Sequence, residues 1–313
     1  MNHFADRLLA AVNDCGNPVC VGLDPRFDLL PQALKDKAVE IHGHTPKAIA
    51  HAFLEFNRAI LEALSGIVRV CKPQIAFYEE LGAEGIRCYA ETIALAQQKG
   101  FLVISDAKRG DIGTTAVAYA RAHLGGKAIT GGVTLGFDAD ALTVNPYMGH
   151  DTITPYLEIC ATNGKGIFVL VKTSNAGSGD IQDLDAGGKP VYEYVAEMVN
   201  KLGDAHRGAN GYSSVGAVVA ATYPEQARRL RELLPRALFL VPGYGAQGAT
   251  AEDCMASFNA DGQGAVVNAS RSIIFAFKQE PYASTLGELG FADAARAAAV
   301  KMAEELKSAH RHH

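Results

Sequence analysis

The sequence predicts an α/β protein of the (β/α)8 TIM-barrel class, built as a single domain over residues 1–313. Eight short apolar runs alternate with eight segments of helical periodicity from one end of the chain to the other. The runs are apolar at nearly every position, as expected of parallel strands covered on both faces. No GxGxxG motif opens the first helix, so a dinucleotide-binding sheet fits less well than a closed barrel.

Each element follows from its local sequence. The expected strands are the apolar runs at 18–24, 68–78, 101–106, 141–147, 166–174, 215–222, 237–243 and 264–270. The expected helices are the segments at 45–65, 82–100, 114–124, 150–164, 191–208, 223–235, 251–259 and 292–309. The first of these helices has Thr45 as its N-cap and Pro46 at its first position. The remaining polar stretches are expected to be loops added to the barrel and, at the end, a disordered tail, at 25–44, 123–140, 175–190 and 310–313.

Composition and charge argue against several classes of function. A net charge of −5 with 20% charged residues gives no basic surplus for nucleic acid and no basic run for a membrane surface. No apolar stretch has the length of a bilayer span, and the first residues lack the features of a signal peptide. The six cysteines show no CxxC spacing, which is typical of buried thiols in a cytoplasmic protein and predicts neither disulfides nor a zinc site.

Polar residues gather where the expected strands end, and in a barrel of this class the catalytic groups lie at those ends. In chain order these residues are Asp24, Lys72, Asp106, Lys108, Asp111, Asn145, Lys172, Thr173, Ser174, Asn175, Gln247, Asn268, Ser270 and Arg271. Ordinary structural alternatives exist: Asp24 suits a strand exit, Lys72 a rim lysine that reaches water, and Ser174 a cap. Arg271 suits a plain surface position, and the charges at 106–111 suit a structural ion-pair network. Their common location at one mouth favours a functional site.

Two kinds of chemistry are indicated at this mouth. Gly243, Gly245 and Gly248, together with Arg271, stand after the last two strands, where barrels of this class bind phosphate. The row of two acids and two lysines suits a different task. A substrate carboxylate about 4 Å from one acid is repelled by roughly 4 kcal/mol at an effective dielectric constant near 20. Departure of the carboxylate as neutral CO2 relieves that repulsion, and a neighbouring ammonium stabilises and protonates the carbanion without metal, cofactor or nucleophile.

The stretch "DAKRGDIGTT" at 106–115 fits the pattern D-x-K-x-x-D-I-(G/P)-x-T and resembles the signature of the orotidine 5′-phosphate decarboxylase family. The segments "VCVGLDPR", "VCKPQIAFYE", "TVNPYMG", "VLVKTSNAGS", "VPGYGAQG" and "VNASRSIIFA" are similar to its longer bacterial subgroup, type 2. The resemblance implies a cytoplasmic enzyme, without metal or cofactor, that converts orotidine 5′-phosphate to uridine 5′-phosphate and CO2 in de novo pyrimidine biosynthesis.

The resemblance also implies a charged array in the active site. Lys72, Asp106, Lys108 and Asp111 would alternate in sign along it. Lys108 would donate the proton to C6 of the pyrimidine, and Asp106 would press against the departing carboxylate. Asp24 and Lys72 would contact the ribose hydroxyls.

Further positions carry implied substrate contacts and an implied assembly. Ser174 would bond the amide edge of the pyrimidine, Gln247 would lie between base and phosphate, and Arg271 would bind the phosphate. Asp111 and Thr115 would reach into the site of a second subunit, so a homodimer is implied. The roles of Lys172, Thr173 and Asn175 stay open, because the sequence around Ser174 departs from that of shorter relatives.

Two other functions stay open at this point. A decarboxylase of keto-sugar phosphates shares the D-x-K-x-x-D row and would use Mg2+ to stabilise an enediolate. A non-catalytic nucleotide-binding barrel is the other alternative. It gains little from acids placed beside an anionic ligand, and fold alone does not separate these functions.

Overall fold

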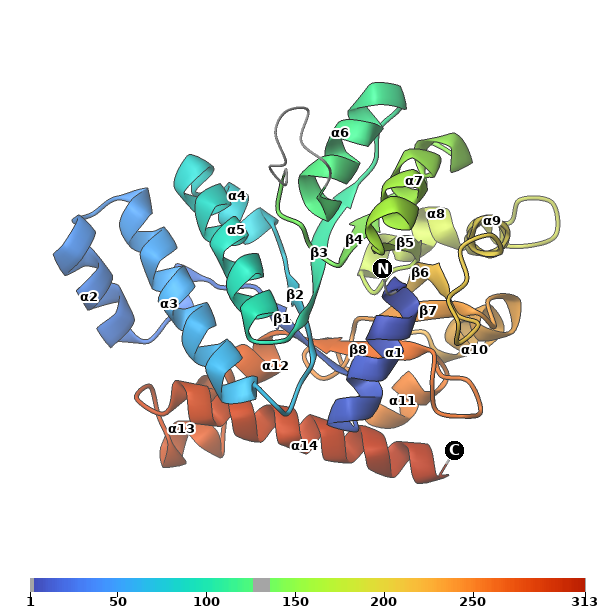
Figure 1. Cartoon of the computed structure of the whole chain (residues 1–313). Helices are drawn as coiled ribbons and strands as arrows, with labels where there is room; N and C mark the ends of the chain where they lie inside the picture. The colour runs from blue at the N-terminus through green and yellow to red at the C-terminus, as the bar shows by residue number, and fades with distance from the viewer. Residues whose placement is uncertain (1–2, 126–135, 313) are drawn as a thin grey trace.

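The computed structural model describes residues 3–125 and 136–312 (Figure 1). Eight strands form a closed barrel in which each strand is parallel to the next and β8 pairs with β1. The strands are β1 (Val19–Leu23), β2 (Val70–Pro73), β3 (Leu102–Arg109), β4 (Ala141–Val144), β5 (Gly166–Lys172), β6 (Ser213–Val219), β7 (Ala237–Val241) and β8 (Ala265–Ala269). The predicted (β/α)8 barrel is therefore confirmed.

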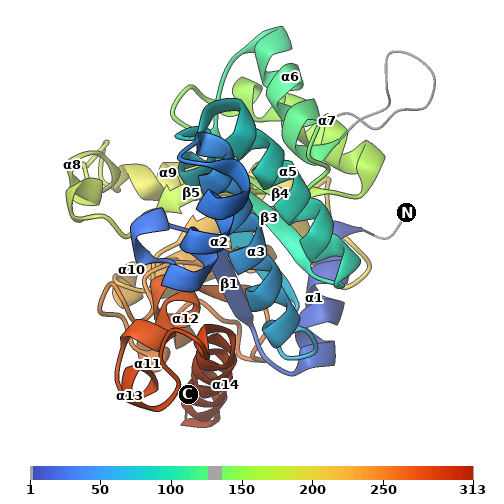
Figure 2. The ribbon, with the colours of Figure 1, turned by 90° about the vertical axis from the view of Figure 1, so that its left-hand side faces the viewer.

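Helices surround this barrel, and Figure 2 shows α2 on the outside of α3. The longer helices are α1 (Phe4–Cys15), α2 (Gln32–His42), α3 (Pro46–Leu64), α5 (Gly82–Gln98), α6 (Gly113–Leu124), α7 (Thr154–Asn163), α9 (Val191–Gly203), α10 (Pro224–Leu233) and α14 (Phe291–His312). The short ones are α4 (Ala76–Glu79), α8 (Gly179–Gln182), α11 (Ala251–Met255), α12 (Arg271–Ile274) and α13 (Tyr282–Thr285). In the described part of the chain, no helix combines the length and the apolar character that a membrane span requires.

Helix α3 begins where its sequence predicts. The Thr45 hydroxyl accepts a hydrogen bond from the backbone N–H of Ala48 at 3.3 Å, and Pro46 occupies the first turn, where its missing N–H costs nothing. Phe53, Phe56 and Ile60 recur at helical spacing and are fully buried. This face packs on the barrel, so the cap and the apolar stripe together fix the start and the orientation of the helix.

Helix α1 fills and closes the barrel interior at the amino-terminal ends of the strands. Leu8 and Leu9 of this helix belong to the same buried cluster as the inward side chains of the strands. The Phe4 ring meets the Phe168 ring edge to face, with 6.0 Å between centroids. Gly166 makes room for it, because a Cβ there would lie 2.1 Å from the Phe4 ring. The other, carboxyl-terminal end of the strands is left to hold a site.

A buried arginine joins the outer layer near the amino-terminal ends of β7 and β8. The Arg231 guanidinium donates five hydrogen bonds of 2.8–3.0 Å to backbone carbonyls, those of Leu234, Ala237, Ser257 and Gly264. It also lies 3.6 Å from the centroid of the Phe239 ring. Burial lowers its pKa to about 10, so the group stays charged and is stabilised by carbonyl dipoles.

Several predicted boundaries were wrong. The strand expected at 68–78 ends at Pro73, and α4 follows at Ala76–Glu79, since a short apolar run such as 75–78 does not distinguish a strand from a helix. The stretch 25–44 is not only loop but contains α2, whose buried Ala38 faces α3. The tail expected to be disordered is helical as far as His312. Of the stretch 123–140, residues 126–135 lie outside the described residues.

Candidate active site

A cavity of about 500 Å3 opens at the carboxyl ends of the strands. Its lining comprises Asp24, Lys72, Asp106, Lys108, Thr143, Leu170, Thr173, Ser174, Asn175, Gln182, Val218, Leu240, Pro242, Gln247, Asn268 and Ser270. Six of the nine residues predicted for the site are among them: Asp24, Lys72, Asp106, Lys108, Ser174 and Gln247. These six residues are distant in the sequence and lie together because the parallel strands end at one rim.

Asp106 lies at the centre of the charged groups. Its Oδ2 accepts from the Lys72 ammonium at 2.7 Å and from the Gln74 amide at 3.0 Å. Its Oδ1 accepts from the Lys108 ammonium at 2.6 Å and from the Thr143 hydroxyl at 2.9 Å. Lys72 and Asp106 are both buried, whereas the Lys108 side chain is 46% exposed. The Lys108 side chain therefore has more freedom than Lys72 to turn towards a ligand.

Both buried members of this group are held in their charged forms. Burial would raise the pKa of Asp106, but the charges of Lys72 and Lys108 outweigh burial and hold that pKa well below its usual range. Burial would lower the pKa of Lys72, but the charges of Asp106 and Asp24 raise it above its usual value. Asp106 is thus held as a carboxylate in the lining of the cavity.

A second cavity, of about 320 Å3, adjoins the first and shares Asp24, Pro242, Gln247, Asn268 and Ser270 with it. Arg271 lines it at the start of α12 and is exposed. Gly22 is needed here, because a Cβ at that position would lie 1.8 Å from the Ser270 hydroxyl oxygen.

The loop after β7 forms the other wall of this second cavity. Gly243, Gly245 and Gly248 have φ values of +111°, +68° and +95°, which favour glycine. The N–H groups of Gly245 and Gly248 bond to Ala249 and Gly245 carbonyls within the loop, so these two amides serve the turn itself. The expected donation of loop amides to a phosphate therefore does not apply to those two, and Arg271 is left as the principal candidate.

The segment after β5 is fastened to the barrel by a buried lysine. Lys172 is fully buried, bonds Asp183 at 2.6 Å and lies 4.4 Å from the Tyr223 ring centroid. The Gln182 side-chain oxygen accepts a hydrogen bond from the Thr173 N–H at 3.0 Å, and its amide nitrogen donates one to the Thr173 hydroxyl at 2.8 Å. Lys172 thus anchors the segment, whereas Thr173 and Gln182 form part of the cavity wall.

Behind the charged group, a chain of hydroxyls runs to a histidine. Ser105 lies next to Asp106 but faces the helices, and its Oγ lies 2.7 Å from the Tyr89 hydroxyl and 2.7 Å from His123 Nδ1. Burial, followed by the charge of Arg109, lowers the pKa of His123 to about 3. Although it resembles a Ser–His pair, this chain is buried and faces away from the cavity, so it supports β3 and is not a nucleophile.

Comparison with known proteins now adds to this geometry. A family model described as "Orotidine 5'-phosphate decarboxylase / HUMPS family" matches residues 17–284. The chain belongs to this family. An orotidine 5′-phosphate decarboxylase of Rhodopirellula baltica is 47% identical over 307 residues, covering 98% of this chain and 100% of that protein. Another, of Clostridium perfringens, is 42% identical and covers 98% and 99%. The solved Leishmania donovani OMP decarboxylase is 32% identical, with a TM-score of 0.73 and 99% coverage of both chains.

Two residues of the family signature, Asp111 and Thr115, are not among the residues that line either cavity. The Asp111 carboxylate accepts a hydrogen bond from the N–H of Ile112 at 2.8 Å, and Thr115 is exposed on α6. Within one chain the charged array therefore has three members. The structure adds Thr143 and Gln74, which the sequence did not single out. Threonine is common in strands for its β-branched shape, so Thr143 gave no signal.

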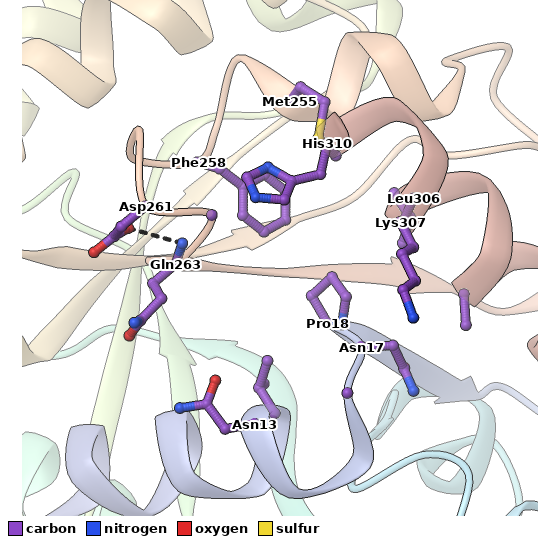
Figure 3. A pocket seen from close by; sticks show the side chains of 14 residues that line it. Asn13, Asn17, Pro18, Met255, Phe258, Asp261, Gln263, Leu306, Lys307 and His310 are labelled. Carbon is purple, nitrogen blue, oxygen red and sulfur yellow. Dashed lines mark hydrogen bonds between the residues drawn. The ribbon is translucent and has the colours of Figure 1, made fainter. Parts of the chain in front are cut away.

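A cavity at the opposite end of the barrel does not share this chemistry (Figure 3). It has a volume of about 290 Å3 and lies where α14 meets the residues that precede β1 and β8. Phe258 and Leu306 supply apolar walls, and Lys307 and His310 are exposed at its edge. Catalytic groups of (β/α)8 barrels lie at the carboxyl ends of the strands, so this cavity is not assigned to the reaction of the family.

Proposed function

We propose that the chain decarboxylates orotidine 5′-phosphate to uridine 5′-phosphate and CO2, the step that this activity supplies in pyrimidine biosynthesis. The observation that carries the proposal is the buried, ionised Asp106, which lines the cavity and is held between two ammonium groups. The 47% identity over the full length of a decarboxylase supports the same assignment. The adjoining cavity with Arg271 suits the 5′-phosphate.

The reaction follows from the charges. The substrate carboxylate on C6 is placed beside Asp106 and is repelled by roughly 4 kcal/mol at about 4 Å, which corresponds to about a thousandfold in rate if all of it is relieved. The C–C bond breaks, CO2 leaves uncharged, and the electron pair stays on C6. The Lys108 ammonium stabilises that carbanion and transfers a proton to C6, and Lys108 then regains a proton from water.

Contacts along the nucleotide complete the proposal. Asp24 Oδ1 is buried without a hydrogen-bond partner in the described structure, and an acceptor in that state suits a ribose hydroxyl. Lys72 would contact the ribose as well, Ser174 the amide edge of the base, and Gln247 the region between base and phosphate. Because the phosphate is remote from C6, its binding energy can be used to hold the reacting carboxylate against Asp106.

The alternative reaction, a magnesium-dependent decarboxylation of keto-sugar phosphates, fits the surroundings of Asp106 poorly. An ionised carboxylate offers about four acceptor positions, and here four donors occupy them. The test is to mix the protein with orotidine 5′-phosphate in excess chelator and to follow CO2 and uridine 5′-phosphate. Turnover that is unchanged by chelator supports the proposal. The proposal is overturned if orotidine 5′-phosphate is not turned over and a keto-sugar phosphate is turned over once magnesium is added.

We also propose a homodimer in which Asp111 and Thr115 complete the site of the partner. Large apolar side chains are exposed on the same rim as Asp111: Ile112 is 62% exposed, Tyr147 82% and Met148 46%. Covering such a patch is a common reason for two copies of a chain to associate.

The six cysteines are free thiols, five of them buried, which fits a reducing compartment, and the cytoplasm is the proposed location.

A further inference from the structure

Thr143 is a buried residue of β4 that faces the cavity, with 1% of its surface exposed. Its hydroxyl oxygen accepts from the N–H of Ala107 at 3.1 Å and from the N–H of Lys108 at 2.9 Å. A hydroxyl has one proton and two lone pairs, and the two N–H groups occupy both lone pairs. The proton is therefore directed at the remaining partner, Asp106 Oδ1, 2.9 Å away.

The same hydroxyl replaces missing strand pairing. Backbone register between β3 and β4 shifts between Ser105 and Arg109, so the stretch between them is not paired as a regular ladder. Lys108 has a φ of +48°, a conformation that residues other than glycine rarely adopt. With its N–H bonded to Thr143, this irregular turn is fixed, and it aims the Lys108 ammonium back at Asp106 Oδ1.

The two donors to Asp106 Oδ1, the Lys108 ammonium and the Thr143 hydroxyl, have different roles in the proposed reaction. Lys108 is half-exposed and has to turn a proton towards C6 of the substrate. When it does so, Thr143 is the donor that still holds Oδ1, while Lys72 and Gln74 hold Oδ2. The orientation of the carboxylate relative to the leaving group then depends on the hydroxyl of Thr143.

From this geometry we infer that Thr143 is a positioning residue for decarboxylation: its hydroxyl fixes the Asp106 carboxylate and the Lys108 backbone in the arrangement that expels CO2. This inference rests on the proposed function. It concerns a step after binding, because Thr143 is directed at Asp106 and the 107–108 backbone and not at the nucleotide phosphate. Loss of the hydroxyl is therefore expected to lower kcat more than it raises KM.

The test compares Thr143→Val, which keeps the shape and removes the hydroxyl, with Thr143→Ser, which keeps the hydroxyl. Losing a hydrogen bond to a charged group at this point is expected to lower kcat by about tenfold or more, with KM and the Kd of uridine 5′-phosphate within about threefold of wild type. The serine variant is expected to keep kcat within about threefold of wild type. Thr92→Val is the matched control, because Thr92 is fully buried and hydrogen-bonded to Asn57 on α3, away from the cavity; its kcat should not change.

An active wild type with a valine variant of normal kcat overturns the role of Thr143 and leaves the proposed function intact. A serine variant as impaired as the valine variant also overturns it, because the methyl group would then be what matters. If the valine variant does not fold, Thr143→Cys gives the comparison, since its thiol is a weaker donor of similar size. The kcat of Thr143→Cys is expected to lie between the wild-type kcat and one tenth of it. A kcat equal to that of wild type contradicts the inference. A wild type without turnover removes the proposed function itself.

Discussion

The buried His123 predicts how the stability of the protein depends on pH. Its pKa is lowered to about 3 in the folded chain, against 6.5 for an ordinary histidine. Above pH 6.5 the ring is neutral in both the folded and the unfolded states, so it leaves stability unchanged. As the pH falls from 6.5 towards 3, the unfolded chain binds a proton that the folded chain does not bind. The free energy of unfolding therefore falls over that window.

The size of the effect follows from the two pKa values. Each pH unit within the window is worth about 1.4 kcal/mol, so moving from about pH 8 to about pH 4.5 removes roughly 3 kcal/mol through this one residue. Asp106 contributes in the same direction, because its pKa is also lowered, but only below the ordinary range of a carboxyl group. The two contributions are therefore largely separated in pH.

Urea unfolding at about pH 8 and about pH 4.5, at one protein concentration, measures this effect. His123→Asn removes the titrating ring and can still bond the Ser105 hydroxyl, so its stability should fall by roughly 3 kcal/mol less than that of wild type between the two values. His44→Asn, at an exposed position, should keep the wild-type dependence. Equal losses in wild type and His123→Asn would refute the assignment of the protonation-sensitive group to His123.

Four other changes test the remaining assignments. Lys108→Ala should lower kcat by about 100-fold or more while uridine 5′-phosphate still binds, as measured by titration calorimetry; normal CO2 release would remove Lys108 as the proton donor. Mixing Lys108→Ala with Asp111→Ala should restore about one quarter of wild-type turnover, because half the dimers are mixed and one of their two sites is intact; no recovery would argue against a shared site. Arg271→Ala should lower kcat/KM and nucleotide affinity about 10- to 100-fold, and unchanged affinity would place the phosphate elsewhere. Arg231→Met should lower the free energy of unfolding by about 3 kcal/mol, because it leaves buried carbonyls unpaired, and should not change kcat.

Much of the fold could be predicted because its signals are local. The cap at Thr45 and Pro46 fixed the start of α3, and the continuous apolar runs located all eight strands. The end of β2 was missed because residues 75–78 are all apolar, a pattern that suits a short helix as well as a strand. Helix α2 was missed because its polar sequence buries little more than Ala38, so it depends on contact with α3 that the sequence does not reveal.

The site could be predicted only in part, for a related reason. Charged residues that follow apolar strands are conspicuous in a sequence, so Lys72, Asp106 and Lys108 can be selected from the sequence alone, and the structure brings them within hydrogen-bond distance. Thr143 is an ordinary residue for a strand, and its role depends on the irregular turn at Lys108, which brings two N–H groups within reach. Such a role depends on backbone geometry between strands and cannot be identified from residue type and spacing.

The closure of the barrel by α1 also bears on the side of the barrel from which products leave the site. Phe4 and Phe168 fill the interior at the amino-terminal end of the strands, whereas the cavity that contains Asp106 opens at their carboxyl ends. In the proposed reaction we therefore expect carbon dioxide to leave by the opening that admits the nucleotide. The two products of the proposed reaction would then share one exit from the site.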